Sequence, residues 1–344
     1  MISCMLAPAA NYLKYIDPRT ICLLFCLMLT VAGFRQSGLL TALSQRLLGG
    51  RGCSARRTGF ALVFLSFFSA PFFTNDVALL AFVPLTAMLF GKRMIYVTVL
   101  QTAAANLGSI LTPFGNPQNL YLYGRYAMSP GEFFSATVPV FISGGALLFL
   151  LCLAIKREPL HVQVQGSAVT APKSHIAVYV LMFVICLLAV FGAVNIAAAM
   201  ILVCGAALAI RPRLLAGVDY GLLITFAFFF IFVGNLREME TVREWISELV
   251  NGREMLASAA VSQVISNVPA AVMLSEFAEN PRAVVLGTNI GGLGTIVASL
   301  ASVISFRIYM ETEGARPLKY LGVFTALNAA LLVIIYIFAD CFLI

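Results

Sequence analysis

The sequence predicts an all-α polytopic membrane protein made of two repeats of inverted topology, each with a re-entrant hairpin and a broken transmembrane helix. Three observations indicate this fold class. Hydrophobic residues make up 61% of the 344-residue chain and charged residues only 11%, which is about half the charged fraction of a soluble protein. Apolar stretches long enough to cross a bilayer recur along the chain. Several of them are interrupted by Pro, Gly and Asn, and these interruptions occur in both halves.

The charge pattern indicates a lipid bilayer as partner and excludes nucleic acid. The net charge is +7, but the Lys and Arg residues lie in short loops between apolar stretches rather than along one polar face. The eight cysteines are scattered through apolar segments without a CxxC motif, so neither a zinc site nor a disulfide framework is indicated. No nucleotide-binding motif is present. We therefore expect no cofactor and no metal site apart from a coupling ion.

The first half of the chain contains five predicted elements. Gly59–Phe90 is too long for one crossing and is interrupted at Pro71–Asp76, which predicts a re-entrant hairpin. Met94–Leu111 and Leu120–Tyr123 form one span, broken by Pro and Gly residues that cannot continue a helix. The other three elements are a span at Thr20–Phe34, an amphipathic interfacial helix at Gly38–Leu48 and a span at Phe133–Ile155.

The second half repeats this order after a polar cytoplasmic linker, residues 158–175, and an extra pair of helices. The extra pair is expected at Ile176–Phe191 and Ile196–Ile210. The later elements are a span at Gly221–Gly234, an amphipathic helix at Leu236–Val250, a hairpin at Met255–Phe277 interrupted at Ser266–Pro269, a span at Ala283–Phe306 broken at Gly291–Gly294, and a last span at Leu318–Ile344. Residues 1–157 are then a first repeat with a shortened N-terminus, and residues 176–344 a second repeat with two extra helices.

Polar residues at the interruptions occupy matching places in the two halves. Asn75 and Asn267 are 192 residues apart, and Asn106 and Asn289 are 183 apart. Each repeat crosses the membrane three times if its hairpin re-enters, and the extra pair adds two crossings, so the second repeat starts on the opposite side. Such inverted repeats are typical of secondary transporters. With the loop after the first span inside, 15 of the 22 Lys and Arg residues are cytoplasmic, which places both termini outside the inner membrane.

The interruptions predict one polar site at membrane depth, because unwound backbone is tolerated there where it lines a cavity. An Asn amide can bind a cation through its oxygen or an anion through its NH2 group, and helix N-termini attract anions. The candidate substrate- and ion-binding residues are Thr74, Asn75, Asp76, Asn106, Gly108, Ser109, Thr112, Pro113, Gly115, Asn116, Pro117, Asn119, Ser266, Asn267, Pro269, Asn289, Gly291, Gly292 and Thr295.

Asp76 is the only carboxylate that the sequence places deep in the membrane, and we expect it to couple transport to protons. Desolvation opposes its ionisation, whereas helix N-termini and a bound cation favour it. Structural interpretations remain open beside these functional ones. Asp76 can be a hydrogen-bonded structural group, the amides of Asn75 and Asn267 can cap the hairpin tips, and residues 112–119 can form a stiff turn outside the membrane.

The motifs TNDVALLAFVPLT, NLGSILTPFGNPQN and SNVPAAVML resemble the ion transporter superfamily, which includes arsenite permeases, citrate-transporter-like permeases and divalent anion–sodium symporters. The chain is most similar to small bacterial inner-membrane permeases of the citrate-transporter-like type. In the anion symporters each hairpin tip carries Ser-Asn-Thr, which helps to hold sodium and substrate. Asn75 and Asn267 match that Asn, so the resemblance implies Na+ at these two residues. Asp76 and Val268 replace the two Thr residues, and the Asn75-Asp76 pair resembles the arsenite-permease branch instead.

We therefore expect a secondary active transporter, not an enzyme, that moves a small anion or oxyanion by elevator-type alternating access coupled to Na+ or H+. A cation/proton antiporter is the alternative. A channel is disfavoured by the paired hairpins. An intramembrane enzyme is disfavoured because it needs a catalytic pair at membrane depth, and both histidines, His161 and His175, fall in the linker. The expected partners are the anionic substrate and the lipid bilayer, and a homodimer is possible.

Overall fold

The structure, a computed structural model, describes residues 12–39, 42, 54–160 and 171–344, and these residues contain helices and no strand. Short 3-10 helices are labelled η. The elements in chain order are η1 (Tyr12–Tyr15), α2 (Pro18–Gln36), α4 (Ala55–Phe73), α5 (Asn75–Phe90), η2 (Gly91–Arg93), α6 (Ile95–Ser109), α7 (Pro117–Arg125), α8 (Pro130–Cys152), α9 (Lys173–Val190), α10 (Ile196–Ile210), η3 (Pro212–Gly217), α11 (Tyr220–Glu238), α12 (Glu240–Val250), α13 (Glu254–Ile265), α14 (Asn267–Leu274), α15 (Pro281–Ile290), η4 (Ile296–Ala298), α16 (Leu300–Met310) and α17 (Pro317–Phe342).

Five of the described helices are long and apolar enough to cross a membrane: α2, α8, α9, α11 and α17. Other apolar helices occur as consecutive pairs, such as α4 with α5 and α13 with α14. These features confirm the predicted all-α polytopic membrane protein. Most of the predicted interfacial helix at Gly38–Leu48 lies outside the described residues. The inverted relation of the two halves stays a prediction.

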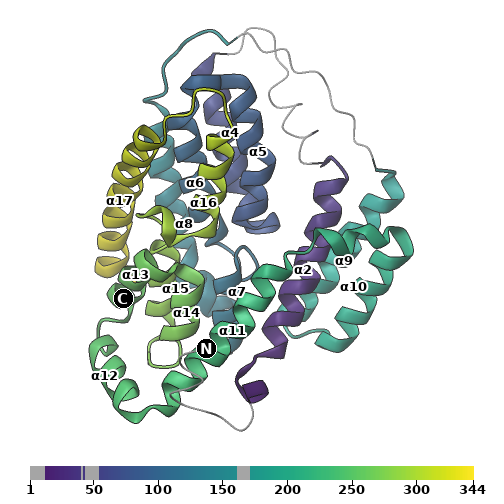
Figure 1. Ribbon diagram of the computed structural model, residues 1–344, viewed down its shortest axis with the longest axis vertical. Coiled ribbons are helices and arrows are strands. Elements are labelled where there is room, and N and C mark those ends of the chain that lie inside the picture. The colour runs from purple at the N-terminus through teal and green to yellow at the C-terminus, as the bar shows by residue number, and fades with distance from the viewer. Residues whose placement is uncertain (1–11, 40–41, 43–53, 161–170) are drawn as a thin grey trace.

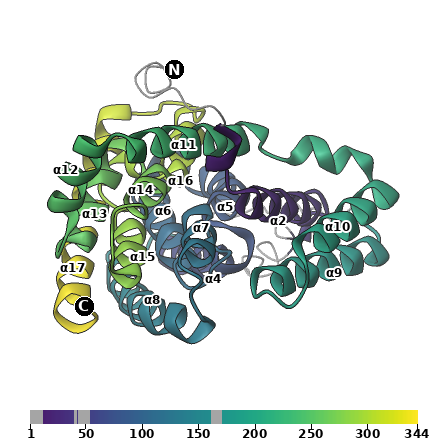
Figure 2. The ribbon, with the colours of Figure 1, turned by 90° about the horizontal axis from the view of Figure 1, so that it is seen from below.

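The helices form two groups that differ in position (Figure 1). The first, which we call the hairpin bundle, consists of α4–α8 and α13–α17, and its core unites buried residues of both halves, such as Leu100 and Leu286. The second, which we call the flanking bundle, consists of α2, α9, α10, η3 and α11. Figure 2 shows α9 and α10 as a lobe on one side, with α11 crossing toward the hairpin bundle. The start of α2 and the end of α17 both lie in the lower half of Figure 1.

Helices α4 and α5 form a hairpin whose two ends meet at Glu158, just after α8. The backbone N–H of Ala55 donates to the Glu158 carbonyl over 2.7 Å, and Arg93 pairs with the Glu158 carboxylate. The break is narrower than the predicted Pro71–Asp76, because only Thr74 leaves the helix. Pro71 lies inside α4, where it leaves the carbonyl of Phe67 without its helical donor. Gly108 of α6 lies directly against that carbonyl, where a larger residue has no room.

The second hairpin, α13 with α14, turns in the same way as the first. Thr74 has φ 68° and ψ 154°, and Ser266 has φ 75° and ψ 153°. A positive φ is rare for residues with a side chain, so the same unusual conformation at both tips is a specific likeness between the halves. The predicted interruption at Ser266–Pro269 is again narrower than expected, because Asn267 and Pro269 already belong to α14.

Each hairpin is followed by a broken helix. The turn between α6 and α7 spans residues 110–116, and the turn between α15 and α16 contains the predicted Gly291–Gly294 break. Thr112 and Asn116 are buried in protein, which argues against a turn exposed outside the membrane. Several helices extend beyond their predicted bounds. For example, α11 runs on to Glu238, and α9 begins at Lys173, inside the predicted linker.

Candidate functional site

The two hairpin tips lie around one cavity of about 350 Å³. Asn75 and Asp76 line it from the first tip, and Ser266, Asn267 and Pro269 line it from the second. The flanking bundle closes the other side with residues of α11, including Asp219 and Thr225. The cavity therefore joins both halves of the chain and both bundles.

Asn267 is the tip amide that is free to bind a ligand. Its side chain is 3% exposed and lies against Gly292, where a Cβ would come within 2.8 Å of its Nδ2. Its Oδ1 accepts only a long hydrogen bond of 3.5 Å from the Ser266 hydroxyl. No residue in the described part of the chain forms a hydrogen bond with its Nδ2. The cavity therefore holds an amide donor without a protein acceptor.

Asn75 forms more hydrogen bonds within the protein than Asn267, its counterpart at the second tip. Its Nδ2 donates to Asn106 Oδ1 over 3.2 Å, and its Oδ1 accepts from the Asp76 backbone N–H over 3.0 Å. The first tip is therefore fixed to the broken helix α6–α7, and Asn75 lines the cavity as a positioned group.

Four other predicted amides hold the two broken helices together instead of lining the larger cavity. Asn106 donates to the carbonyl of Gly292 over 3.1 Å and accepts from the Ser299 hydroxyl over 3.0 Å. In return, Asn289 accepts from Asn116 over 3.0 Å and donates to Asn119. Asn106 and Asn289, which occupy matching places 183 residues apart, thus each form hydrogen bonds with the other broken helix.

The remaining predicted residues support these breaks from inside the protein. Thr112 donates to the carbonyl of Pro71 over 2.6 Å, and Ser109 accepts from Asn116 over 3.1 Å. In the second half, Gln263 of α13 donates to the Gly291 carbonyl and accepts from the Thr295 backbone N–H. Gly108, Pro113 and Gly115 are buried in the first break, and Pro117 begins α7 at the edge of the cavity.

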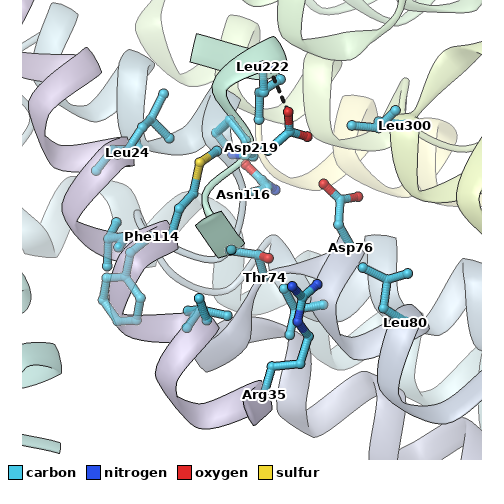
Figure 3. A pocket seen from close by; sticks show the side chains of 18 of the residues that line it. Leu24, Arg35, Thr74, Asp76, Leu80, Phe114, Asn116, Asp219, Leu222 and Leu300 are labelled. Carbon is cyan, nitrogen blue, oxygen red and sulfur yellow. Dashed lines mark hydrogen bonds between the residues drawn. The ribbon is translucent and has the colours of Figure 1, made fainter. Parts of the chain in front are cut away.

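Asp76 lines both the larger cavity and a smaller neighbour of about 160 Å³, to which Thr74 also contributes (Figure 3). It lies in the first turn of α5. Its Oδ1 is buried and has no hydrogen-bond partner in the described part of the chain. A carboxylate oxygen in that situation is costly, so Asp76 is suited to bind a proton or a cation.

Asp219 is a second carboxylate beside these cavities that the sequence analysis did not include among the candidate site residues. Asp219 lines both cavities and caps α11, where its Oδ1 accepts from the Leu222 backbone N–H over 3.0 Å. Arg35, near the end of α2, lines the smaller cavity. The sequence analysis missed both because they lie at the ends of apolar stretches, where charges normally reach solvent. The N-cap pattern of an Asp before an apolar stretch is the one signal that points to Asp219.

No group of three or more His, Cys, Asp or Glu side chains in the described ranges is placed to hold a metal ion. The oxygen atoms near the tips are amide, hydroxyl, carboxylate and backbone carbonyl oxygens, which suit a hard cation such as Na+ rather than a transition metal.

Comparisons with known proteins point to a family of transporters. A family model described as citrate transporter matches residues 1–282. An uncharacterized transporter of Methanocaldococcus jannaschii is 33% identical over 299 residues, which are 85% of this chain and 81% of the relative. The inner membrane protein YbiR of Escherichia coli is 32% identical over 304 residues, which are 85% of this chain and 80% of that protein.

Proposed function

The chain belongs to the citrate transporter family and is a membrane transporter, and we propose that it moves a small anion or oxyanion across the inner membrane in exchange for, or together with, Na+ or H+. No nucleotide-binding motif is present in the sequence, so an ion gradient is the energy source. The substrate site is the cavity between the two hairpin tips.

One observation carries the anion assignment. Helices α5 and α14 both begin at this cavity, and their N-cap residues, Thr74 and Ser266, form no capping hydrogen bond. Free N–H groups and the positive end of the helix dipole favour an anion at such a place. The unpaired amide NH2 of Asn267 adds a donor on the same side. These groups together can bind a carboxylate or an oxyanion.

The coupling ion has two candidate places. Helices α4 and α13 end at the tips, and the last carbonyl groups of a helix lack intrahelical partners. Such carbonyls, together with the oxygen atoms of Asn75 and Asn267, suit Na+. Asp76, with its unpartnered buried oxygen, suits H+. A cation bound at either place reduces the repulsion between an anionic substrate and Asp76.

Movement of the hairpin bundle against the flanking bundle would expose this cavity to each side in turn. The similar backbone angles at Thr74 and Ser266 support two structurally equivalent tips. One hydrophobic core lies entirely within the hairpin bundle, and this supports movement of that bundle as a unit, because packed cores keep their shape. On this basis we propose an elevator-type mechanism with inverted repeats and with both termini outside.

A cation/proton antiporter is the second candidate, and one observation favours it. Asp76 and Asp219 both line the cavities, and two carboxylates with a single Arg give the cavity a net negative charge when all three are ionised. Such a cavity can exchange a cation for protons without any anion.

Uptake into proteoliposomes tests the proposal. Purified protein is reconstituted, and uptake of labelled citrate, succinate, sulfate and arsenite is followed with an imposed Na+ or H+ gradient. We expect saturable, gradient-dependent uptake of one of these anions. Gradient-driven Na+/H+ exchange with no anion requirement would instead identify an antiporter, and non-saturable anion flux would identify a channel.

A further inference from the structure

The smaller cavity has a cationic end that no carboxylate of the described chain neutralises. Arg35 lies there, and Figure 3 shows its guanidinium directed toward Thr74, with Asp76 and Asp219 further along the cavity. Arg35 comes from the flanking bundle, whereas Thr74 and Asp76 come from the tip of the first hairpin. The cavity therefore lies between the two bundles.

Arg35 has no ion-pair partner within 4 Å in the described ranges, whereas three arginines near the hairpins form ion pairs. Arg93 pairs with Glu158, and Arg125 and Arg237 both pair with Glu276. A carboxylate is available in the same cavity, yet no ion pair forms between it and Arg35. The guanidinium lies over Gly217 instead, with Nη2 3.9 Å from the place where a Cβ would stand.

The two carboxylates do not compensate for Arg35. Asp219 is committed to the start of α11 through its hydrogen bond to Leu222, where the helix dipole offsets part of its charge. The Oδ1 of Asp76 is unpartnered. The cavity consequently has a cation at one end and carboxylates at the other, with apolar side chains such as Leu80 between them.

We propose that Arg35 selects for anions at the entrance of this cavity and contacts the substrate on its way to the hairpin tips. This inference rests on the proposed function, because it assigns a selecting residue to the same transport site. A guanidinium presents paired N–H donors that match a carboxylate or an oxyanion. A substrate anion bound at Arg35 contacts the flanking bundle, whereas an anion bound at the hairpin tips contacts the hairpin bundle. The substrate therefore meets Arg35 before it reaches the tips.

If Arg35 only anchors α2 at the membrane surface, a different result is expected. An arginine at the end of a transmembrane helix often extends its charge toward lipid headgroups. In that case the charge has no effect on the cavity, and the preference of the cavity for anions does not depend on residue 35.

Charge-selective labelling distinguishes the two roles without any transported substrate. The variant Leu80→Cys, in a background where the eight native cysteines are replaced, places one thiol in the cavity. Its reaction rates are measured with an anionic and a cationic methanethiosulfonate reagent. One unit charge about 8 Å away changes each rate several-fold at an effective dielectric constant of about 40. The two rates change in opposite directions, so we expect Arg35→Gln to lower the anionic-to-cationic rate ratio by about thirty-fold, and Arg35→Lys to keep most of the ratio.

The matched control is Arg307→Gln on α16, because Arg307 pairs with Glu311 and does not line the cavity. This control should leave the ratio unchanged. A ratio that stays the same in Arg35→Gln, while Leu80→Cys still reacts, overturns the inference even if anion uptake is found. A changed ratio without uptake of any tested anion supports the role of Arg35 and counts against the proposed transport instead.

Discussion

The side-chain amide of Asn106 donates a hydrogen bond over 3.1 Å to the backbone carbonyl of Gly292, 186 residues further along the chain. This bond joins the first broken helix to the break of the second. Asn289 forms the reciprocal connection with Asn116 and Asn119. The two halves therefore contact each other through a buried network of amide side chains. The first hairpin tip is attached to this network through the bond between Asn75 and Asn106.

The first prediction concerns the stability of this network. Asn106→Ala removes the partner of the Gly292 carbonyl, the Ser299 hydroxyl and the Asn75 amide. Leaving a buried polar group unpaired costs about 1–3 kcal/mol, so we expect a clear fall in the thermal unfolding midpoint in detergent. Asn251→Ala, at an exposed amide after α12, is the control. Equal midpoints for the two variants would show that the network does not stabilise the fold.

The second prediction concerns the contact between α6 and α4. A Cβ on Gly108 would lie 2.1 Å from the Phe67 backbone carbonyl oxygen, which cannot move without shifting the helix. We expect Gly108→Ala to prevent normal folding, with most of the protein aggregated in size-exclusion chromatography. Gly124→Ala, which meets no atom within 4 Å, should elute like the wild type. A monodisperse Gly108→Ala protein with unchanged unfolding would contradict this packing.

Much of the fold was predictable because hydrophobic length and helix breakers are local signals. The sequence predicts the spans and the two interruptions. It also predicts that Asn106 and Asn289 occupy matching places in the two halves. The roles of these amides do not, since the sequence cannot tell which amide is satisfied by a distant carbonyl. Asn267 and Asn289 look alike in sequence, yet one lines a cavity and the other bonds to Asn116 and Asn119. Asp219 and Arg35 were missed because only tertiary packing brings the ends of α11 and α2 to the site.

The third prediction concerns the ion pairs of Glu276, just after α14. Glu276 accepts from Arg125 of its own bundle over 2.9 Å and from Arg237 of the flanking bundle over 3.1 Å. If the bundles move relative to each other, only the second pair must break. Partly exposed pairs contribute about 0.2–1 kcal/mol, so Arg237→Gln should raise thiol labelling of a Val268→Cys tip by up to about five-fold.

Arg125→Gln is the comparison for this test, because it removes a pair within one bundle. It should change the labelling rate much less than Arg237→Gln does. Equal effects of both variants would indicate that Glu276 only stabilises the local structure.

The fourth prediction concerns the pH dependence of transport. Asp76→Asn keeps the shape of the side chain but cannot exchange a proton, so we expect uptake that no longer varies with pH. Asp219→Asn is the control, because Asn caps a helix as well as Asp does and the cap on Leu222 should persist. Uptake by both variants is measured in proteoliposomes at several pH values with and without a Na+ gradient. A wild-type pH profile in Asp76→Asn would leave Asp76 with a structural role or assign the coupling to Na+ alone.

The central claim is that the two hairpin tips form one transport site, and the most direct test is uptake by Asn267→Ala beside Asn75→Ala. Asn267 makes only one long hydrogen bond, so Asn267→Ala should unfold at the wild-type temperature. Asn75→Ala loses the bond to Asn106 and should be somewhat less stable. In proteoliposomes with the gradient that drives the wild type, we predict that each variant loses anion uptake, because each removes a ligand from the shared cavity. Wild-type uptake by folded Asn267→Ala would contradict the claim.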